Sequence, residues 1–241
     1  MTDINNLKKI ATGGQAEIYD LLNGKILRLM LRSYDSFLVD YEYQAMEIAK
    51  ECGLLVPEVF EKVKVGDRPG LVMERIDGPT LTKLFQKKPH LLFKKTKELS
   101  EIHYNLNKIK APEHLSDLKN EIRKIIDKSD FIDVECKEFV LDLLNQLPDG
   151  DRLCHGDFHP GNILIKNGDP YIIDWCAATK ADPIADVAHT FLLFKNVPKI
   201  PGSSNISFNI LKLAGLVHPI FILKHMKKNI RLILINFLNG Y

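Results

Sequence analysis

Length, composition and charge place the chain among folded proteins without a strong electrostatic bias. It has 241 residues, of which 45% are hydrophobic and 27% charged, so it can bury a substantial core as one large domain or two small lobes. This content excludes a disordered chain, and a formal net charge of +2 gives no overall argument for nucleic acid or acidic polymers as partners.

Cysteine usage and the N-terminal segment indicate an intracellular protein. The four cysteines are scattered without a C-x-x-C pair, which predicts neither a zinc site nor a disulfide framework and fits reduced thiols. The first residues lack a charged region followed by an apolar stretch, and no apolar run is long enough to span a bilayer. We therefore expect a cytoplasmic location, no stable membrane insertion and no nucleic-acid partner, and the oligomeric state stays open.

Alternating apolar residues between positions 7 and 31 predict a curled antiparallel sheet. Its expected strands are residues 7–10, 17–22 and 25–31. Asn23 and Gly24, between two apolar runs, are a strong signal for a two-residue hairpin. Gly13 and Gly14 form another turn, which either lies over nucleotide phosphates, since glycine allows close backbone approach, or is an ordinary hairpin turn.

A helix is predicted from residue 34 to residue 52. Its apolar side chains recur at helical spacing, and Gly53 follows at a position where helices often end. The helix carries Glu42, and in protein kinases a strand lysine pairs with a glutamate of the following helix and holds the phosphates. Arg28 is the matching strand residue, with Lys25 on the opposite face as the alternative. We expect Arg28 to pair with Glu42.

Two further strands are predicted, within residues 54–65 and at residues 71–76, with a turn at 66–70 between them. Asp77-Gly78-Pro79 breaks the second strand and is the natural hinge between two lobes. Residues 80–147 are then largely helical, because apolar residues recur with helical period in three stretches: 91–109, 115–126 and 131–147.

The backbone next to the hinge is a candidate adenine contact. Residues Glu74 to Ile76 follow Met73 directly, and their peptide groups are available to hydrogen-bond an adenine edge. A strand this apolar is equally consistent with a place in the core.

The strongest functional signal lies between residues 153 and 174. His155-Gly156-Asp157, with Asn162 five positions after the aspartate, has the spacing of the protein-kinase catalytic loop H-R-D-L-x-x-x-N. In that loop the aspartate receives the acceptor proton and the asparagine holds a magnesium ion. Asp174 takes the place of the magnesium-binding aspartate of the kinase D-F-G motif.

Phosphoryl transfer requires these residue types. It concentrates negative charge on the nucleotide phosphates, so hard oxygen ligands must bring magnesium to them while another carboxylate orients the attacking hydroxyl. Two short strands are predicted, at residues 163–165 and 171–173, with a turn at residues 167–170 between them. This hairpin would return Asp174 beside Asn162. The stretch 182–188 then begins a helix on which Asp186 is expected to anchor the catalytic loop by hydrogen bonds.

These motifs resemble those of the aminoglycoside phosphotransferase and choline kinase-like family. The resemblance runs from the Gly13-Gly14 loop to about Ala188. Its marks are Leu71-Val72-Met73-Glu74 before Gly78, the loop from His155 to Asn162, Ile173-Asp174-Trp175, and Asp182-Pro183 with Asp186. It implies an α+β, bilobal protein-kinase-like fold. Residues 1–77 would be a small antiparallel-sheet N-lobe that binds nucleotide, and 78–241 a mostly helical C-lobe with the catalytic loop and acceptor site.

The resemblance also implies cofactors and residue roles, with ATP or another nucleoside triphosphate and Mg²⁺ as the cofactors. Asp157 would be the catalytic base or hydroxyl-orienting acid, and Asn162 and Asp174 the magnesium ligands. The cofactor-binding residues would be Gly13, Gly14, Arg28, Glu42, Met73, Glu74 and Ile76. The glycine loop lacks a full G-x-G-x-x-G, and Arg28 stands where many relatives carry lysine, so a planar guanidinium replaces a compact ammonium.

The acceptor is predicted from the charge of the C-terminal region. After Asp186 there is no Asp or Glu, and seven basic residues remain: Lys195, Lys199, Lys212, Lys224, Lys227, Lys228 and Arg231. Relatives that bind polycationic aminoglycosides use acidic pockets lined partly by C-terminal helices. We therefore predict an ATP- and magnesium-dependent phosphotransferase acting on a hydroxyl of a neutral or anionic small molecule, such as a sugar, amino alcohol or related metabolite. Aminoglycosides are disfavoured.

The basic tail itself has two interpretations. It is either a solvated face of helices whose apolar sides, at residues 220–223 and 230–238, pack into the C-lobe, or a basic amphipathic helix that lies on a membrane surface or a partner.

Two other functions fit parts of the sequence. A nucleotide-binding pseudokinase or regulatory module without turnover fits Arg28 and the reduced glycine loop, whereas the intact Asp157, Asn162 and Asp174 argue against it. A protein kinase is disfavoured, because the chain lacks an A-P-E segment and has Gly156 in place of the arginine of H-R-D.

Overall fold

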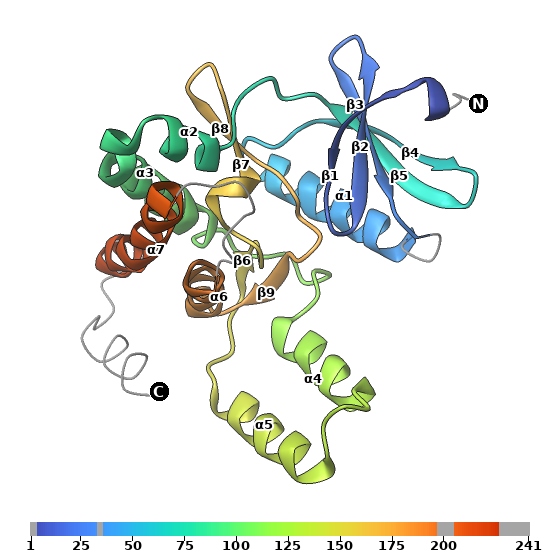
Figure 1. The fold of residues 1–241 in the computed structure, drawn as a ribbon. Helices are drawn as coiled ribbons and strands as arrows, with labels where there is room; N and C mark the ends of the chain where they lie inside the picture. Colours follow the sequence, from blue (N-terminus) through green and yellow to red (C-terminus); the bar gives the residue numbers. More distant parts are fainter. Residues whose placement is uncertain (1–3, 33–35, 197–204, 227–241) are drawn as a thin grey trace. The chain divides into compact units, whose positions relative to one another are not determined.

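The computed structural model describes residues 4–32, 36–196 and 205–226, in which an antiparallel sheet precedes a mostly helical region (Figure 1). The predicted α+β class is thereby confirmed. The chain divides into two compact units: the first consists of Met1–Leu81 and Gly161–Ala177, and the second of Thr82–Pro160 and Ala178–Tyr241. The functional division into lobes at residue 77 stays a prediction.

Five antiparallel strands form the sheet of the first unit, in the order β1-β2-β3-β5-β4. Their bounds are β1 Lys8–Thr12, β2 Ala16–Leu22, β3 Lys25–Met30, β4 Val59–Val65 and β5 Arg68–Glu74, after a short 3-10 helix, η1, at Ile4–Asn6. The predicted hairpin between β2 and β3 is confirmed. Asn23 and Gly24 both have positive φ there, a conformation that asparagine and glycine tolerate best.

The turn between β4 and β5 is shorter than the predicted 66–70. It consists of Gly66 and Asp67, and Gly70 lies inside β5. Proline and glycine usually mark turns, which is why the sequence is misleading here. Gly70 is needed for a different reason, because β3 approaches closely and an added Cβ would lie 2.6 Å from the carbonyl oxygen of Arg28.

Helix α1, Ser36–Glu51, packs against β4 and β5. It ends as predicted, with Gly53 at a φ of 81° and the N–H of Leu54 donating to the carbonyl of Ala49. The expected start at residue 34 lies outside the described residues. Glu42 is on the buried face of this helix, which explains how a charged residue enters the interior of the first unit.

A second hairpin completes the first unit. It consists of β7, Ile163–Lys166, and β8, Asp169–Ile172. The turn is shorter than the predicted 167–170, because Asn167 and Gly168 both have positive φ and close the hairpin with two residues. Just beyond the strands, the N–H of Ile173 donates to the carbonyl of Asn162 over 3.0 Å. The hairpin therefore returns Asp174 beside Asn162, as predicted.

The β7–β8 hairpin is tied to the hinge segment that follows β5. The N–H of Ile165 donates to the carbonyl of Pro79 over 3.0 Å, and Nζ of Lys166 lies 2.8 Å from Oε1 of Glu74. Gly78 permits this contact, since a Cβ at that position would lie 2.0 Å from the carbonyl oxygen of Ile165. These bonds explain why the hairpin belongs to the first unit although it lies far from the sheet in sequence.

The second unit is mostly helical, which confirms the prediction for residues 80–147. Its first helix, α2, begins at the end of the first unit. The helices are α2 Leu81–Lys87, η3 Pro89–Leu91, α3 Leu92–Leu106, α4 Leu118–Lys128, α5 Val134–Gln146, α6 Pro183–Lys195 and α7 Asn205–His225. A two-stranded sheet, β6 Arg152–Cys154 with β9 Thr179–Ala181, stands before α6. Asp182 caps α6 by accepting from the N–H of Ile184, with Pro183 at the first helical position.

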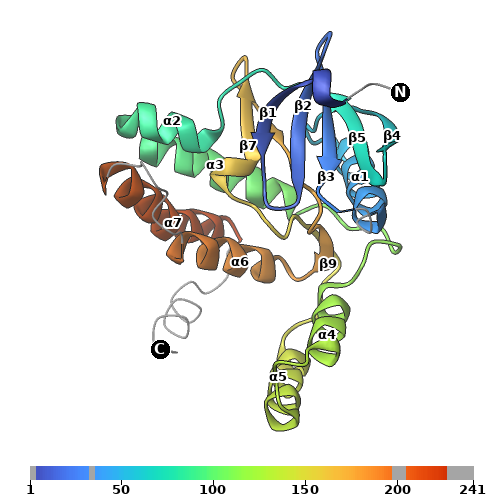
Figure 2. The same cartoon turned by 45° about the vertical axis from the view of Figure 1, so that its right-hand side comes forward.

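Helix α7 packs against α3 and α6, and two views show the three helices together, whereas α4 and α5 form a separate pair (Figures 1 and 2). The side chains of Leu99, Leu106 and Phe158 are fully buried in the second unit. Within the part of the chain that the structure describes, none of the helices combines the length and hydropathy needed to cross a membrane.

Candidate active site

Arg28 is the central charged group of the first unit. It lies on β3 between Ile18 of β2 and Leu71 of β5, and only 8% of it is exposed. One guanidinium nitrogen is 2.8 Å from the carboxylate of Glu42, and the other donates to Oδ1 of Asp174 over 3.0 Å. The predicted pair of Arg28 with Glu42 is confirmed.

Lys25, the alternative to Arg28, does not share this environment. It is exposed, and its ammonium group lies 4.4 Å from the centre of the Phe60 ring on β4. The alternation of side chains along β3 thus separates the two basic residues as expected.

Burial and charge act against each other on this cluster. Burial alone would lower the pKa of Arg28, but the carboxylate of Glu42, followed by Cys176 and Asp174, raises it, so the guanidinium stays protonated. Burial raises the pKa of Glu42, and the charge of Arg28 opposes this change. Burial likewise raises the pKa of the Cys176 thiol, which therefore stays neutral.

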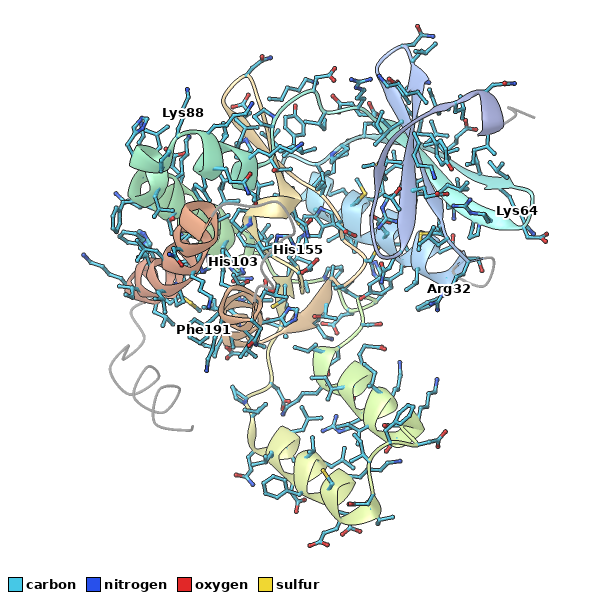
Figure 3. All side chains as sticks on the ribbon, in the orientation of Figure 1. Arg32, Lys64, Lys88, His103, His155 and Phe191 are labelled. Atoms are coloured by element: carbon cyan, nitrogen blue, oxygen red, sulfur yellow. The ribbon has the colours of Figure 1, made fainter. Side chains whose placement is uncertain are left out.

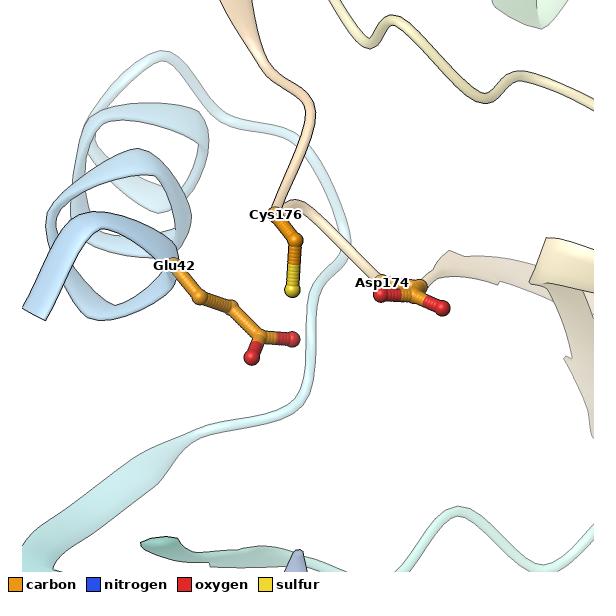
Figure 4. A group of neighbouring side chains, drawn as sticks. All are labelled: Glu42, Asp174 and Cys176. Carbon is orange, nitrogen blue, oxygen red and sulfur yellow. The ribbon is translucent and has the colours of Figure 1, made fainter. Parts of the chain in front are cut away.

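The side chains of Glu42, Asp174 and Cys176 lie close together (Figure 4), and each of them contacts the guanidinium of Arg28. Their potential ligand atoms lie within 4.8 Å of one another, and Nη2 of Arg28 is 3.3 Å from Sγ of Cys176. A magnesium ion prefers oxygen ligands, and the protonated guanidinium already neutralises the buried side of the cluster. The three residues together are therefore a poor cation site, and only the partly exposed carboxylate of Asp174 suits a hard ion.

The backbone of Asp174 has an unusual conformation. Its φ is +65°, which non-glycine residues rarely adopt outside turns and functional sites. The neighbouring Trp175 is fully buried and donates from its ring N–H to the carbonyl of Ile172 over 3.1 Å. This hydrogen bond holds the chain so that the side chain of Asp174 remains partly exposed while the side chain of Trp175 lies in the core.

Asn162 belongs to the same part of the first unit. It ends the short 3-10 helix η4, Pro160–Asn162, and it is 92% buried, with its carbonyl bonded to the N–H of Ile173. The two predicted magnesium ligands, Asn162 and Asp174, thus flank the hairpin at its base.

The Gly13-Gly14 turn connects β1 and β2. The N–H of Gly13 donates to the carbonyl of Ala16 over 2.8 Å, which closes the turn. Neither glycine has a positive φ, and a Cβ at Gly14 would meet no atom within 4 Å. The fold itself therefore does not require glycine at position 14, in contrast to Gly24 and Gly70.

The predicted adenine contacts lie at the end of β5. Met73 and Ile76 are buried, and the N–H groups of Glu74 and Arg75 donate to the carbonyls of Glu58 and Gly24. The N–H of Ile76 differs from these two groups. Within the described residues, it donates to no backbone carbonyl of a turn or loop.

Asp157 lies in the second unit, on the loop between β6 and η4. Its side chain is 34% exposed, and its Oδ2 lies 3.7 Å from Nε2 of His159. Its own N–H donates to Nδ1 of His155 over 3.2 Å, and Gly156 supplies a φ of +76° that a larger residue would resist. The loop thus presents the carboxylate while its backbone turns sharply.

Asp186 fixes the backbone before Asp157, which confirms the expected anchor. Its two carboxylate oxygens accept from the N–H groups of His155 and Gly156, each over 2.9 Å. Burial would raise the pKa of Asp186, but His103 and these hydrogen bonds hold it well below its ordinary value, so the carboxylate remains charged.

Sequence reasoning missed several residues around this loop. The hydroxyl of Thr190 donates to the carbonyl of Phe158 over 2.9 Å, so α6 holds the chain on both sides of Asp157. Helical spacing from Asp186 could have found Thr190, because residues four apart share a helix face. His103, which contacts Asp186, has no comparable signal in the sequence.

Comparison with known proteins connects this geometry to a family. The model of the phosphotransferase enzyme family matches residues 7–201. A comparison with curated proteins found no match.

Solved structures with a similar fold include three phosphotransferases. A thermostable mutant of aminoglycoside phosphotransferase APH(4)-Ia in complex with AMP-PNP and hygromycin B has a TM-score of 0.63 at 14% identity, over 94% of this chain and 80% of that one. ADP-bound APH(2'')-Ib has a TM-score of 0.62 at 16% identity, over 95% of this chain and 79% of that one. The amicoumacin kinase hAmiN in complex with AMP-PNP, Ca²⁺ and Ami has a TM-score of 0.58 at 14% identity, over 90% and 72%.

These identities support a shared fold and carry no substrate across. Together with the family match over most of its length, they lead to one conclusion: the chain belongs to the phosphotransferase enzyme family and has a protein-kinase-like fold.

Proposed function

We propose that the protein is an ATP- and magnesium-dependent kinase that phosphorylates a hydroxyl group of a small molecule. The observation that carries this proposal is the cluster in which Arg28, paired with the buried Glu42, holds Asp174 next to Asn162. A cation and two oxygen ligands on one compact unit are what nucleotide phosphates and their metal ion require.

The residues fit a magnesium ion. Asn162 and Asp174 offer an amide oxygen and a carboxylate oxygen, which hard cations prefer, and the carboxylate of Asp174 is partly exposed. When bound, magnesium would neutralise charge on the nucleotide phosphates and orient them. Arg28 would keep the Asp174 carboxylate directed and add a permanent positive charge beside it, because its pKa is raised in this cluster.

The first unit also has groups for the rest of the nucleotide. Since the N–H groups of Glu74 and Arg75 have backbone partners, the N–H of Ile76 and the carbonyl of Glu74 are the candidates for an adenine edge. Gly14 would leave space for phosphate oxygens, which explains a glycine where the fold needs none.

Asp157 would orient the acceptor. Its carboxylate accepts a hydrogen bond from the attacking hydroxyl, whose oxygen forms the new bond to the γ-phosphorus. The bond from that phosphorus to the bridging oxygen breaks, ADP leaves, and the hydroxyl proton passes to the carboxylate. The loop positions this side chain because Asp186 and Thr190 fix the backbone on both of its sides.

The acceptor is proposed to be neutral or anionic, such as a sugar, an amino alcohol or a related metabolite. In the described part of the region after Asp186, Lys195, Lys212 and Lys224 are exposed, and no acid is present there. The remaining basic residues, Lys199, Lys227, Lys228 and Arg231, lie outside the described residues, as does the apolar stretch 230–238. A positively charged surface disfavours polycationic acceptors such as aminoglycosides.

The test is a measurement of acceptor-dependent ADP release with magnesium across sugars, amino alcohols and aminoglycosides. Turnover with a neutral or anionic acceptor is expected, and mass spectrometry should find one added phosphate on it. Efficient turnover with aminoglycosides would overturn the proposed acceptor class. Nucleotide binding with no turnover for any acceptor would instead make the protein a nucleotide-binding module without catalysis.

A further inference from the structure

A row of buried polar side chains connects helix α7 with the catalytic loop inside the second unit. Nε2 of His218 on α7 is 3.3 Å from Nδ1 of His103 on α3, and Nε2 of His103 is 2.9 Å from Oδ2 of Asp186 on α6. All three residues are buried, and Figure 3 shows His103 in the interior near His155 of the catalytic loop. We call His218, His103 and Asp186 the relay.

The relay ends on the backbone that carries Asp157. Asp186 accepts from the N–H groups of His155 and Gly156, and its Oδ2 also accepts from the side-chain amide of Asn107 over 3.1 Å. The direction of the Asp186 carboxylate therefore depends on how its other donors are placed. His103 is the side chain that both contacts this carboxylate and reaches toward α7.

One assignment of ring protons satisfies these contacts. The carboxylate of Asp186 accepts, so Nε2 of His103 carries a proton and its Nδ1 accepts from Nε2 of His218. The remaining ring nitrogen, Nδ1 of His218, has no hydrogen-bond partner among the described residues. Burial also lowers the pKa of His218, which agrees with an unprotonated Nδ1. His218 thereby selects the form of His103 that donates to Asp186.

Stability alone does not account for a histidine at position 218. The buried neighbours on its helix, Ala214, Ile222 and Leu223, are apolar or small, and one ring nitrogen of His218 has no hydrogen-bond partner within the described part of the chain. A buried polar atom without a hydrogen bond destabilises a fold. An apolar side chain would serve the packing against Phe158 and Phe194, whose ring centres both lie 6.4 Å from that of His218.

We propose that His218 and His103 are positioning residues for Asp157. Through Asp186 they fix the amides of His155 and Gly156 and so hold the catalytic carboxylate in the orientation that the acceptor hydroxyl needs. The expected effect of His218 and His103 on turnover rests on the proposed kinase function. Their effect on the loop backbone is independent of that function.

The test compares His218→Leu with His218→Gln. The amide nitrogen of glutamine can replace the Nε2 donor, whereas leucine removes it and leaves an apolar side chain of similar size. Ile222→Val, a truncation at a fully buried position of the same helix outside the relay, is the matched control. Each variant is assayed for melting temperature, kcat, the KM for ATP, and hydrogen exchange of the His155 and Gly156 amides.

His218→Leu removes one unpartnered ring nitrogen and leaves another, Nδ1 of His103, so the melting temperature should stay close to that of the wild type. Its kcat should fall about tenfold, as is typical when a supporting hydrogen bond of a catalytic group is removed. The KM for ATP should stay within about twofold, because the nucleotide groups lie on the first unit, and the two amides should exchange at least about tenfold faster. His218→Gln should have the kcat of the wild type and wild-type exchange of the His155 and Gly156 amides. Ile222→Val should lower the melting temperature and leave kcat and the two amides unchanged.

Two results would overturn the proposal. One is a folded His218→Leu variant with wild-type amide exchange. Another is a decrease in kcat that accompanies a decrease in melting temperature to the same extent in His218→Leu and Ile222→Val. His218 would then contribute only to packing. If the wild type shows no turnover with any acceptor, the kinase function fails, and faster exchange in His218→Leu would still support the relay.

Discussion

Arg28 has a structural role in the first unit and, in the proposed function, a second role at the nucleotide phosphates. It is buried, pairs with the nearly inaccessible Glu42 and also holds the partly exposed Asp174. The sequence predicted the pair with Glu42 from the spacing of a strand and a helix. It did not predict the contacts with Asp174 and Cys176, because these depend on where the β7–β8 hairpin meets β3.

Replacing Arg28 with methionine is expected to destabilise the protein strongly. The change leaves Glu42 buried without its cation, and breaking one partner of a buried ion pair typically costs about 3–5 kcal/mol of unfolding free energy. Urea denaturation at neutral pH measures this loss. The double variant Arg28→Met/Glu42→Leu should recover most of the stability but not nucleotide binding. A single variant as stable as the wild type would contradict the role assigned to the pair.

The stability loss of Arg28→Met should also depend on pH. Burial raises the pKa of Glu42 in the folded state, and removing the opposing charge of Arg28 raises it further. A raised carboxyl pKa favours folding below the unfolded value of about 4.3, and this contribution disappears as the pH rises through the folded pKa. The deficit relative to the wild type should therefore shrink as the pH falls toward about 4. A deficit that grows on acidification would contradict this assignment.

Gly14 is expected to matter for nucleotide binding and not for stability. Gly14→Ala places a methyl group in open space without a positive φ, so the melting temperature should stay constant or rise slightly, whereas the KM for ATP should increase. Gly24→Ala is the control with the opposite signature. Its φ of 74° should cost about 1 kcal/mol in unfolding free energy and leave the KM unchanged. An unchanged KM for ATP in Gly14→Ala would contradict the proposal that this turn leaves space for the nucleotide phosphates.

At the scale of elements, local turn chemistry was predictable and strand extent was less so. Asn23-Gly24 closes the predicted two-residue hairpin, because its positive φ values are local properties, whereas the turn predicted at 167–170 consists only of Asn167 and Gly168. The turn at 66–70 was predicted too long, since Gly70 is required by the neighbouring strand and marks no turn. Tertiary contacts of this kind leave no periodic signal in a single sequence.

Helix α6 is the element that holds the loop carrying Asp157. Asp186 and Thr190 lie four residues apart on it and bind the backbone on the two sides of Asp157. Conversion of Thr190 to valine keeps the shape and removes the donor to the carbonyl of Phe158. We expect a loss of about 1–3 kcal/mol in unfolding free energy and a lower kcat with little change in the KM for ATP.

Thr96 provides the matched control for this prediction. It is fully buried on α3, and its hydroxyl has no hydrogen-bond partner among the described residues. Thr96→Val should therefore be neutral or stabilising and should leave kcat unchanged. Equal effects of the two threonine variants, measured by thermal unfolding and steady-state kinetics, would show that the bond from Thr190 does not position the loop.

At the scale of the whole molecule, the chain distributes its candidate groups over two units. Arg28, Asn162 and Asp174 belong to the first unit, and Asp157 to the second. The sequence predicted these residues as candidates because their spacing along the chain matches that of protein-kinase motifs. It could not predict the relay, since His103 and His218 are 115 residues apart and meet only through the packing of α3 and α7.

The most direct measurement of the proposed chemistry is transfer of labelled γ-phosphate to an accepted small molecule by the wild type and by Asp157→Asn. The substitution keeps the size of the side chain and removes its charge. We expect kcat to fall at least about 100-fold, as for loss of a general base, while the dissociation constant for ATP stays within about threefold. Transfer at the wild-type rate by a folded Asp157→Asn variant would contradict the assignment of Asp157 and the phosphotransfer site built around it.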